Sequence, residues 1–127
     1  MIIYFLFQSV ISIIIFMIFL LMGNYGDGYI GMAPLSMLFA VCIQFVVSTI
    51  LYYIIRNFIK SQAYYLFIII HMVIFELSFL VFTYSSPIAN IFEEDFRGFV
   101  SRCEFFSSLM SGLIVLMFFY LRKIHKK

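Results

Sequence analysis

The apolar run over residues 64–84, YYLFIIIHMVIFELSFLVFTY, constrains the fold most, because it is long enough to cross a bilayer and still carries His71 and Glu76. A transmembrane helix needs about 20 apolar residues, each adding about 1.5 Å along the axis. An ionisable side chain near the bilayer centre costs on the order of 2.5–3.5 kcal/mol on insertion scales, so it usually faces other helices or a hydrated cavity. The run therefore predicts a transmembrane helix packed among partners.

His71 and Glu76 are predicted to point to different sides of this helix. They are five residues apart, which corresponds to about 140° around a helix of 3.6 residues per turn. Side chains on one helix pair at spacings of three or four, so each of these two needs a partner on another helix. Two interpretations stay open: both groups are satisfied structurally, or they line or gate a path for ions.

Composition supports a membrane protein throughout. Hydrophobic residues make up 65% and charged residues 11% of the 127 residues, whereas soluble domains have about 45–50% and 25%. The length fits one domain. We therefore predict an all-α integral membrane protein, with residues 1–127 forming a single domain of four transmembrane helices in an antiparallel bundle and an amphipathic helical segment before the fourth.

The four predicted crossings span residues 2–22, 34–55, 64–84 and 105–121. The first run has no basic residue before it and is longer than the apolar core of a signal peptide, so we expect a retained helix. Residues 23–33 are rich in glycine and predict a loop, and Pro34 suits the first turn of the next helix. The short connection over residues 56–63 predicts antiparallel neighbours.

Polar side chains recur inside the crossings. Gln8 and Ser12 are four residues apart on the first, and Gln44 and Ser48 are four apart on the second. Antiparallel packing would bring Gln44 and Glu76 to a similar depth, so Gln44 is the first candidate partner for Glu76. Our candidates for lining or gating a pore are therefore Glu76, His71, Gln44, Ser48 and Gln8.

The stretch over residues 88–104 has the densest charge. Asn90 followed by Glu93 resembles a capping box, and Glu93 with Arg97 forms an i,i+4 pair. An apolar stripe at 4-3-4 spacing consists of Phe92, Phe96, Phe99 and Cys103. We expect an amphipathic helix that lies at the interface or leads into the last crossing, with a bend at Gly98. Its stripe faces lipid or, alternatively, docks a partner.

The last crossing carries a patch of small residues that lets helix backbones approach closely. Its helix-packing candidates are Ser108, Ser111 and Gly112. This patch serves packing within one chain or between copies. The two cysteines, Cys42 and Cys103, have no CxxC spacing, and we expect two buried free thiols.

Basic residues are distributed unevenly over the two predicted faces. With four crossings, one face holds both termini and six basic residues: Arg56, Lys60, Arg122, Lys123, Lys126 and Lys127. The other, outer face holds two basic residues, Arg97 and Arg102, together with the acidic residues Asp27, Glu93, Glu94, Asp95 and Glu104. Lys and Arg concentrate on the cytoplasmic side, so we expect both termini in the cytoplasm, in a bacterial plasma (inner) membrane. Arg56, Lys60, Arg122 and Lys123 are also candidates for binding anionic lipid or another anionic ligand.

Catalytic and cofactor motifs are not present in the sequence. It has no metal-ligand spacing, no nucleophile–histidine arrangement and no nucleic-acid-binding module. We expect no enzyme, no cofactor and no metal.

Two functions compete at this point. The first is a homo-oligomeric ion or small-solute channel or permease whose path forms between copies. A variant is a membrane-permeabilising effector gated at its basic cytoplasmic face. The second is a non-conducting accessory or scaffold subunit of a larger membrane complex. The expected partners are therefore the lipid bilayer, further copies of the chain or another membrane protein.

Overall fold

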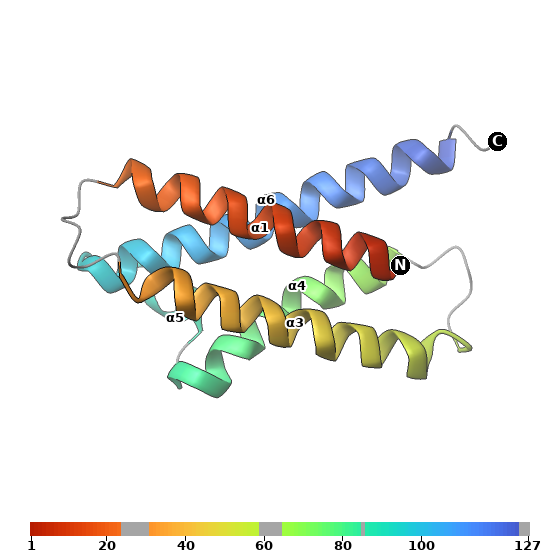
Figure 1. Cartoon of the computed structure of the whole chain (residues 1–127), viewed down its shortest axis with the longest axis horizontal. Coiled ribbons are helices and arrows are strands. Elements are labelled where there is room, and N and C mark those ends of the chain that lie inside the picture. Colours follow the sequence, from red (N-terminus) through yellow and green to blue (C-terminus); the bar gives the residue numbers. More distant parts are fainter. Residues whose placement is uncertain (24–30, 59–64, 85, 125–127) are drawn as a thin grey trace.

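All regular elements of the described chain are helices. The computed structural model describes residues 1–23, 31–58, 65–84 and 86–124. In chain order the elements are α1 (Ile2–Met22), α3 (Ala33–Ile55), α4 (Tyr65–Thr83), α5 (Pro87–Asn90) and α6 (Phe96–Ile124) (Figure 1). The prediction of an all-α protein is confirmed for this part of the chain.

Helices α1, α3 and α6 are each long and apolar enough to cross a membrane. The bounds of α1 and α3 agree with the predicted crossings to within one residue, and Pro34 lies in the first turn of α3 as predicted. Helix α4 has a shorter apolar part, Tyr65–Val81. Tyr64, at which the predicted third crossing begins, lies outside the described residues. The protein is therefore membrane-associated through at least these apolar helices.

The predicted fourth crossing is only part of α6, which has 29 residues. At about 1.5 Å per residue this helix is roughly 44 Å long, whereas the hydrocarbon core of a bilayer is about 30 Å thick. The second half of the predicted amphipathic segment therefore forms the first turns of α6 itself. Of its stripe, Phe92 is exposed and lies between α5 and α6, so the stripe does not extend to it. Phe96, Phe99 and Cys103 lie on α6 at spacings of three and four and share one side of that helix.

The capping prediction was wrong, because two helices begin in this region rather than one. Asn90 is the last residue of α5, and the side chain of Ser86 caps α5 by accepting a hydrogen bond from the Ala89 N–H. The start of α6 is capped by Asp95, whose Oδ1 accepts a hydrogen bond from the Gly98 N–H at 2.9 Å. A capping side chain satisfies an N–H that has no partner within its own helix.

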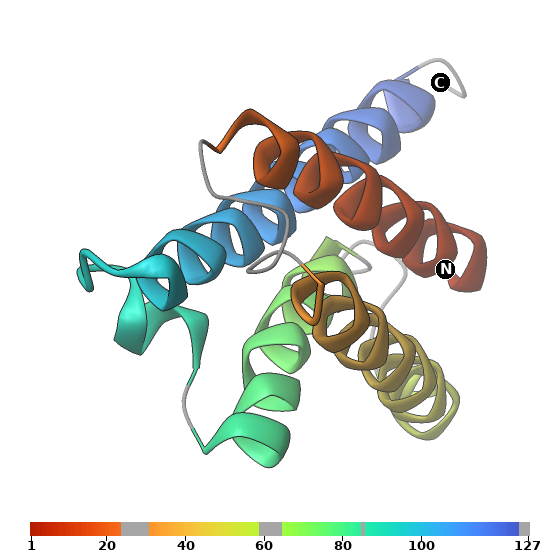
Figure 2. The ribbon, with the colours of Figure 1, turned by 60° about the vertical axis from the view of Figure 1, so that its left-hand side comes forward.

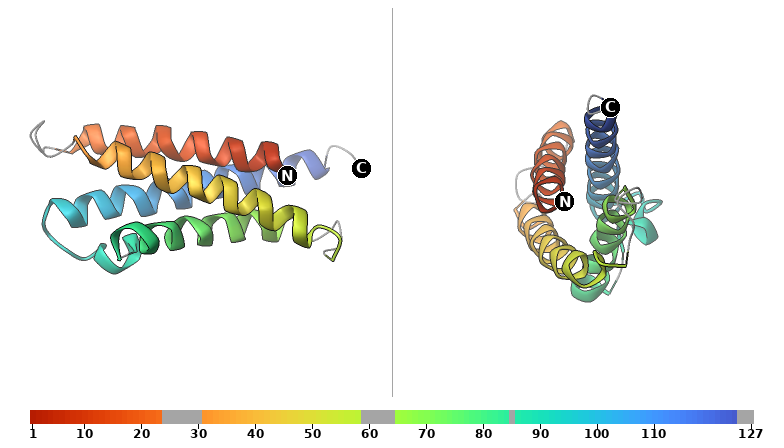
Figure 3. Two further views of the ribbon diagram at one scale, coloured as in Figure 1. Left: turned by 60° about the horizontal axis from the view of Figure 1, so that its bottom comes forward. Right: turned by 90° about the vertical axis from the view of Figure 1, so that its right-hand side faces the viewer.

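The four long helices, α1, α3, α4 and α6, pack in a ring. Helix α1 lies between α3 and α6, and α4 also contacts α3 and α6 (Figures 2 and 3). The first residue of α1 and the last turns of α6 lie toward the same end of the molecule (Figure 1). We call this the terminal end, and the end that holds α5 the loop end.

The interior divides along the length of the ring. Toward the loop end it is mainly apolar, apart from the buried Ser101 and Glu104, with a cluster that includes Phe16, Leu20, Met37, Phe75 and Phe79. Toward the terminal end the buried residues are largely polar. Polar side chains are costly inside a membrane and commonly mark substrate or ion pathways, so this half is a candidate functional site.

The patch of small residues on α6 packs inside the chain. Ser108, Ser111 and Gly112 are all buried. A Cβ atom added at Gly112 would lie 2.9 Å from Cε and 3.0 Å from Cγ of Met72, so glycine allows α4 to approach α6 closely. The two cysteines are free, but only Cys103 is buried. The prediction that both are buried was wrong, because Cys42 lies on the outer surface of α3.

Candidate functional site

His71 lies at the centre of the polar half and is fully buried. Its Nδ1 atom is 2.6 Å from Ser48 Oγ on α3, and its Nε2 atom is 3.4 Å from Ser9 Oγ on α1. The ring of Phe5 stacks on the imidazole with centroids 4.8 Å apart and an interplanar angle of 14°. His71 therefore has partners on two other helices, as the burial of a polar ring requires.

Gln44 forms its hydrogen bond with the backbone of His71 rather than with Glu76. Its Nε2 atom donates a hydrogen bond to the backbone carbonyl oxygen of His71 at 2.8 Å. The predicted partnership of Gln44 with Glu76 was wrong, because Gln44 meets α4 five residues earlier, about 7.5 Å along the axis. The relative axial position of two helices is set by how their side chains pack, which helix periodicity does not specify.

Several buried polar atoms near this network have no hydrogen-bond partner among the described residues. They are Gln8 Nε2, Gln8 Oε1, Ser12 Oγ and Gln44 Oε1. An amide or hydroxyl left unpaired in a protein interior costs roughly 1–3 kcal/mol. Native structures contain few such groups, and they are often found where a polar species binds. The side chain of Gln8, which is 1% exposed, is therefore a candidate contact for a small solute.

Helix α6 adds buried hydroxyls to the same interior. Ser107 Oγ donates to the Glu104 carbonyl oxygen at 2.8 Å, and Ser111 Oγ donates to the Ser108 carbonyl oxygen at 2.9 Å. Each hydroxyl proton is thus used within α6, and the oxygen keeps its capacity to accept a hydrogen bond. Buried polar side chains accordingly come from all four long helices.

Glu76 is half-buried and faces the loop end. One of its carboxylate oxygens accepts a hydrogen bond from the backbone N–H of Ile88 on α5, at 3.4 Å. It also lies close enough to Glu104 for the two carboxyl groups to interact electrostatically. His71 and Glu76 thus have separate partners on other elements, as predicted from their angular separation.

Glu104 is the residue that the sequence interpretation missed. It was assigned to the outer face, but it is only 5% exposed and lies inside the ring. The signal was available in the spacing, since Ser101, Glu104, Ser108 and Ser111 recur at intervals of three and four and are all buried. That spacing marks one face of a helix. The predicted fourth crossing begins at residue 105, directly after Glu104, which is why this residue was assigned to the interface.

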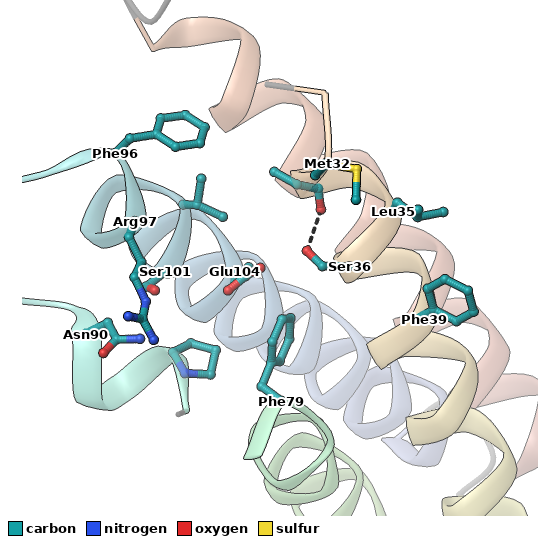
Figure 4. Close-up of a pocket in the computed structure, with 13 residues that line it drawn as sticks. Met32, Leu35, Ser36, Phe39, Phe79, Asn90, Phe96, Arg97, Ser101 and Glu104 are labelled. Atoms are coloured by element: carbon teal, nitrogen blue, oxygen red, sulfur yellow. Dashed lines mark hydrogen bonds between the residues drawn. The ribbon is translucent and has the colours of Figure 1, made fainter. Parts of the chain in front are cut away.

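A cavity of about 490 Å³ lies at the loop end, next to Glu104. Its lining comes from α3, α4, α5 and α6 and includes Ser36, Phe39, Phe79, Asn90, Arg97 and Glu104. In Figure 4 the Glu104 side chain extends from α6 into the space between Ser36 and Phe79. Pockets for small organic ligands typically measure about 300–1,000 Å³.

The basic candidates that the structure describes have separate contacts. Arg56 is exposed at the end of α3 and lies 5.2 Å from the centroid of the Tyr53 ring. Arg122 on α6 donates to the Tyr4 hydroxyl at 3.4 Å. Lys123 is exposed one residue further along α6, and Lys60 lies outside the described residues. An anionic ligand site assembled from these residues therefore gains no support from their positions.

Comparison with other proteins assigns this chain neither a family nor a function. The chain matches no protein-family model, no curated protein and no solved structure. Within the described ranges, no three His, Cys, Asp or Glu side chains converge as a metal site would require. The function is therefore argued from the polar interior and the cavity.

Proposed function

We propose that this chain is a small channel or permease that moves an ion or a small solute through its own interior. The observation that carries the proposal is the buried polar half of the ring, above all the fully buried amide of Gln8, whose two polar atoms lack partners among the described residues. Polar residues inside a membrane are costly and commonly mark substrate or ion pathways.

The path lies within one chain in this proposal. The earlier hypothesis put it between copies, but Gln8, Gln44, Ser48 and His71 are each at most 2% exposed. Side chains buried inside one copy cannot line a space between two copies. Self-association is therefore not needed to form the path, although it is compatible with it.

Aromatic rings close the terminal end of this path in the described conformation. The Phe5 ring, which stacks on His71, lies 6.3 Å from the Tyr52 ring, and Tyr52 lies 5.2 Å from Phe67. Hydrophobic constrictions of this kind can stop conduction by excluding water. We infer a conformation closed at the terminal end, with the cavity at the loop end.

The proposed topology has four antiparallel crossings and both termini in the cytoplasm of a bacterial cell. Helix α4 has 19 residues, or roughly 28 Å, which is close to the 30 Å core. The excess of Lys and Arg near the terminal end supports this orientation. Two variants, Lys123→Cys and Glu94→Cys, each made in a chain without other cysteines, test this topology. A membrane-impermeant maleimide applied to intact cells should label only the Glu94→Cys variant. Labelling of both would contradict the topology.

Flux into liposomes tests the function. Purified protein reconstituted alone should release trapped small ions, and Gln8→Leu should reduce that flux, because it removes the unpaired amide from the path. Val10→Leu is the matched control, since Val10 is an exposed residue of the same helix. Wild-type liposomes that stay tight to all small ions and solutes tested would refute the channel or permease.

The alternative is a non-conducting accessory or scaffold subunit of a larger membrane complex. The specific observation in its favour is that both ring nitrogens of His71 already have hydrogen-bond partners, as expected of a purely structural histidine. Tight liposomes together with co-purification of a second membrane protein would support this alternative.

A further inference from the structure

The cavity at the loop end combines apolar walls with a buried carboxyl group. Met32, the residue before α3, and residues of α3 as far as Phe39 contribute to it, so this wall extends about 10 Å along the helix axis. Glu104 lies eight residues into α6, about 12 Å from its start. Glu104 is therefore at the inner end of the cavity rather than at its mouth.

No described residue donates a hydrogen bond to the Glu104 carboxylate, although its side chain is 95% buried. The charged group that acts on it electrostatically is Glu76, which carries the same sign. A carboxylate removed from water is expensive unless it is paired with a cation or well hydrogen-bonded. Among the residues that the structure describes, none pairs this carboxylate with a positive charge at the inner end of the cavity.

The two arginines of this region do not supply that charge. Arg102 Nη1 donates to the carbonyl oxygens of Ile91 at 3.0 Å and Glu93 at 2.9 Å, so its guanidinium is held against the connection between α5 and α6. Arg97 is exposed on the first turn of α6, and in Figure 4 its guanidinium points toward Asn90 rather than toward Glu104.

Three aromatic rings form part of the cavity wall. Phe39 from α3, Phe79 from α4 and Phe96 from α6 all contribute to its surface. The faces of aromatic rings attract organic cations, quaternary ammonium groups in particular, and the attraction increases when water is excluded. A buried carboxyl group together with several phenylalanines suits a cation with an apolar body better than it suits a hydrated metal ion.

We propose that this cavity binds a small organic cation, an amine or quaternary ammonium compound with apolar substituents, whose charge is neutralised by Glu104. The proposal deepens the proposed function by naming a substrate class. It rests on that function only for the step in which the cation is carried across the membrane; binding rests on the cavity alone.

Isothermal titration calorimetry on the full chain in detergent tests binding. The probe is benzyltrimethylammonium. N-benzylacetamide and 3-phenylpropanoate have the same number of non-hydrogen atoms and serve as the neutral and anionic comparisons. Benzyltrimethylammonium should bind with a Kd of about 1 mM or tighter, as a compact ligand of this size can. The neutral and anionic compounds should bind at least about tenfold more weakly.

Three variants connect binding to the cavity. Glu104→Gln keeps the shape and removes the charge, and should weaken binding of benzyltrimethylammonium by about ten- to hundredfold. Ser36→Leu fills the cavity without changing any charge, and should also weaken binding. Glu94→Gln removes a carboxylate from the exposed connection between α5 and α6, outside the cavity lining, and should leave binding unchanged.

The possible outcomes separate this inference from the proposed function. Absence of binding to the wild-type chain, equal binding of the neutral compound, or unchanged binding in Glu104→Gln would each overturn the cation site. A phospholipid that co-purifies in the cavity and is displaced equally by all three compounds would also overturn it. If benzyltrimethylammonium binds as expected but liposomes stay tight, transport is wrong and the site stands. If ions leak but the cation does not bind, transport stands and the site is wrong.

Discussion

Gly98 gives the sharpest test of the packing around the cavity, because helix propensity and tertiary contact predict opposite signs for Gly98→Ala. A Cβ atom at this position would overlap the carbonyl oxygen of Glu93 and lie 2.5 Å from the carbonyl carbon. Ordinary contact begins at 3.4 Å, so the carbonyl carbon must retreat by about 0.9 Å and the carbonyl oxygen, which is closer still, by more than that. Gly98 is thus explained by a close backbone approach, and nothing in the structure requires the predicted bend there.

Two interactions are lost or weakened by such a shift. The Glu93 carbonyl accepts a hydrogen bond from Arg102 Nη1 at 2.9 Å, and the Gly98 N–H is capped by Asp95. An exposed hydrogen bond from a charged donor contributes about 1 kcal/mol, and a cap contributes about 1 kcal/mol. Alanine in a helix is favoured over glycine by roughly 1 kcal/mol. We expect a net loss of about 1–2 kcal/mol, once steric strain is added to these contributions.

Thermal unfolding in detergent measures this effect. The free, buried thiol of Cys103 reports unfolding when it reacts with a fluorogenic maleimide, once the exposed Cys42 has been replaced by alanine. A loss of 1 kcal/mol lowers the midpoint by about 2–8 °C in domains of this size range. The control is Gly31→Ala, where an added Cβ atom would meet nothing within 4 Å. A midpoint for Gly98→Ala equal to or above that of the parent would refute the reasoning.

Three further predictions concern the ring interior, each measured by the same thiol assay. Ser48→Ala removes the partner of His71 Nδ1 and should destabilise the chain by about 0.6–2 kcal/mol, the range measured for hydrogen bonds between transmembrane helices. Gly112→Val should lower the midpoint by several degrees, because α6 would be pushed away from Met72; truncating Met72 to alanine in the same chain should restore part of the loss. Gln8→Leu should not destabilise the chain and should raise the midpoint if the unpaired amide is costly, while reducing ion flux.

For each of these three variants, one outcome of the thiol assay would contradict the prediction. Thr49→Ala is the control for Ser48→Ala, since the Thr49 hydroxyl donates to the Phe45 carbonyl oxygen of its own helix at 2.8 Å. Equal losses of stability in both variants would mean that the hydrogen bond between Ser48 and His71 does not stabilise the chain. Failure of the Met72 truncation to rescue Gly112→Val would place the clash elsewhere. A lowered midpoint for Gln8→Leu would mean that Gln8 is a structural group.

The sequence alone determined which segments are apolar helices and where most of them begin and end. The bounds of α1 and α3 were predicted to within one residue, because an apolar run cannot end inside a membrane and Pro34 begins a helix readily. It also determined that His71 and Glu76 lie on different sides of one helix, since their angle follows from the 3.6-residue period alone.

Only the tertiary structure decided which partners these side chains meet. Gln44 bonds to His71 rather than to Glu76, and Glu104 lies inside the ring rather than at the interface. The physical reason is that periodicity fixes the angle of a residue on its own helix, whereas the rotation and axial shift between helices depend on how small residues such as Gly112 let the backbones approach. The polar half of the interior, the proximity of Glu76 to Glu104 and the cavity all result from that packing.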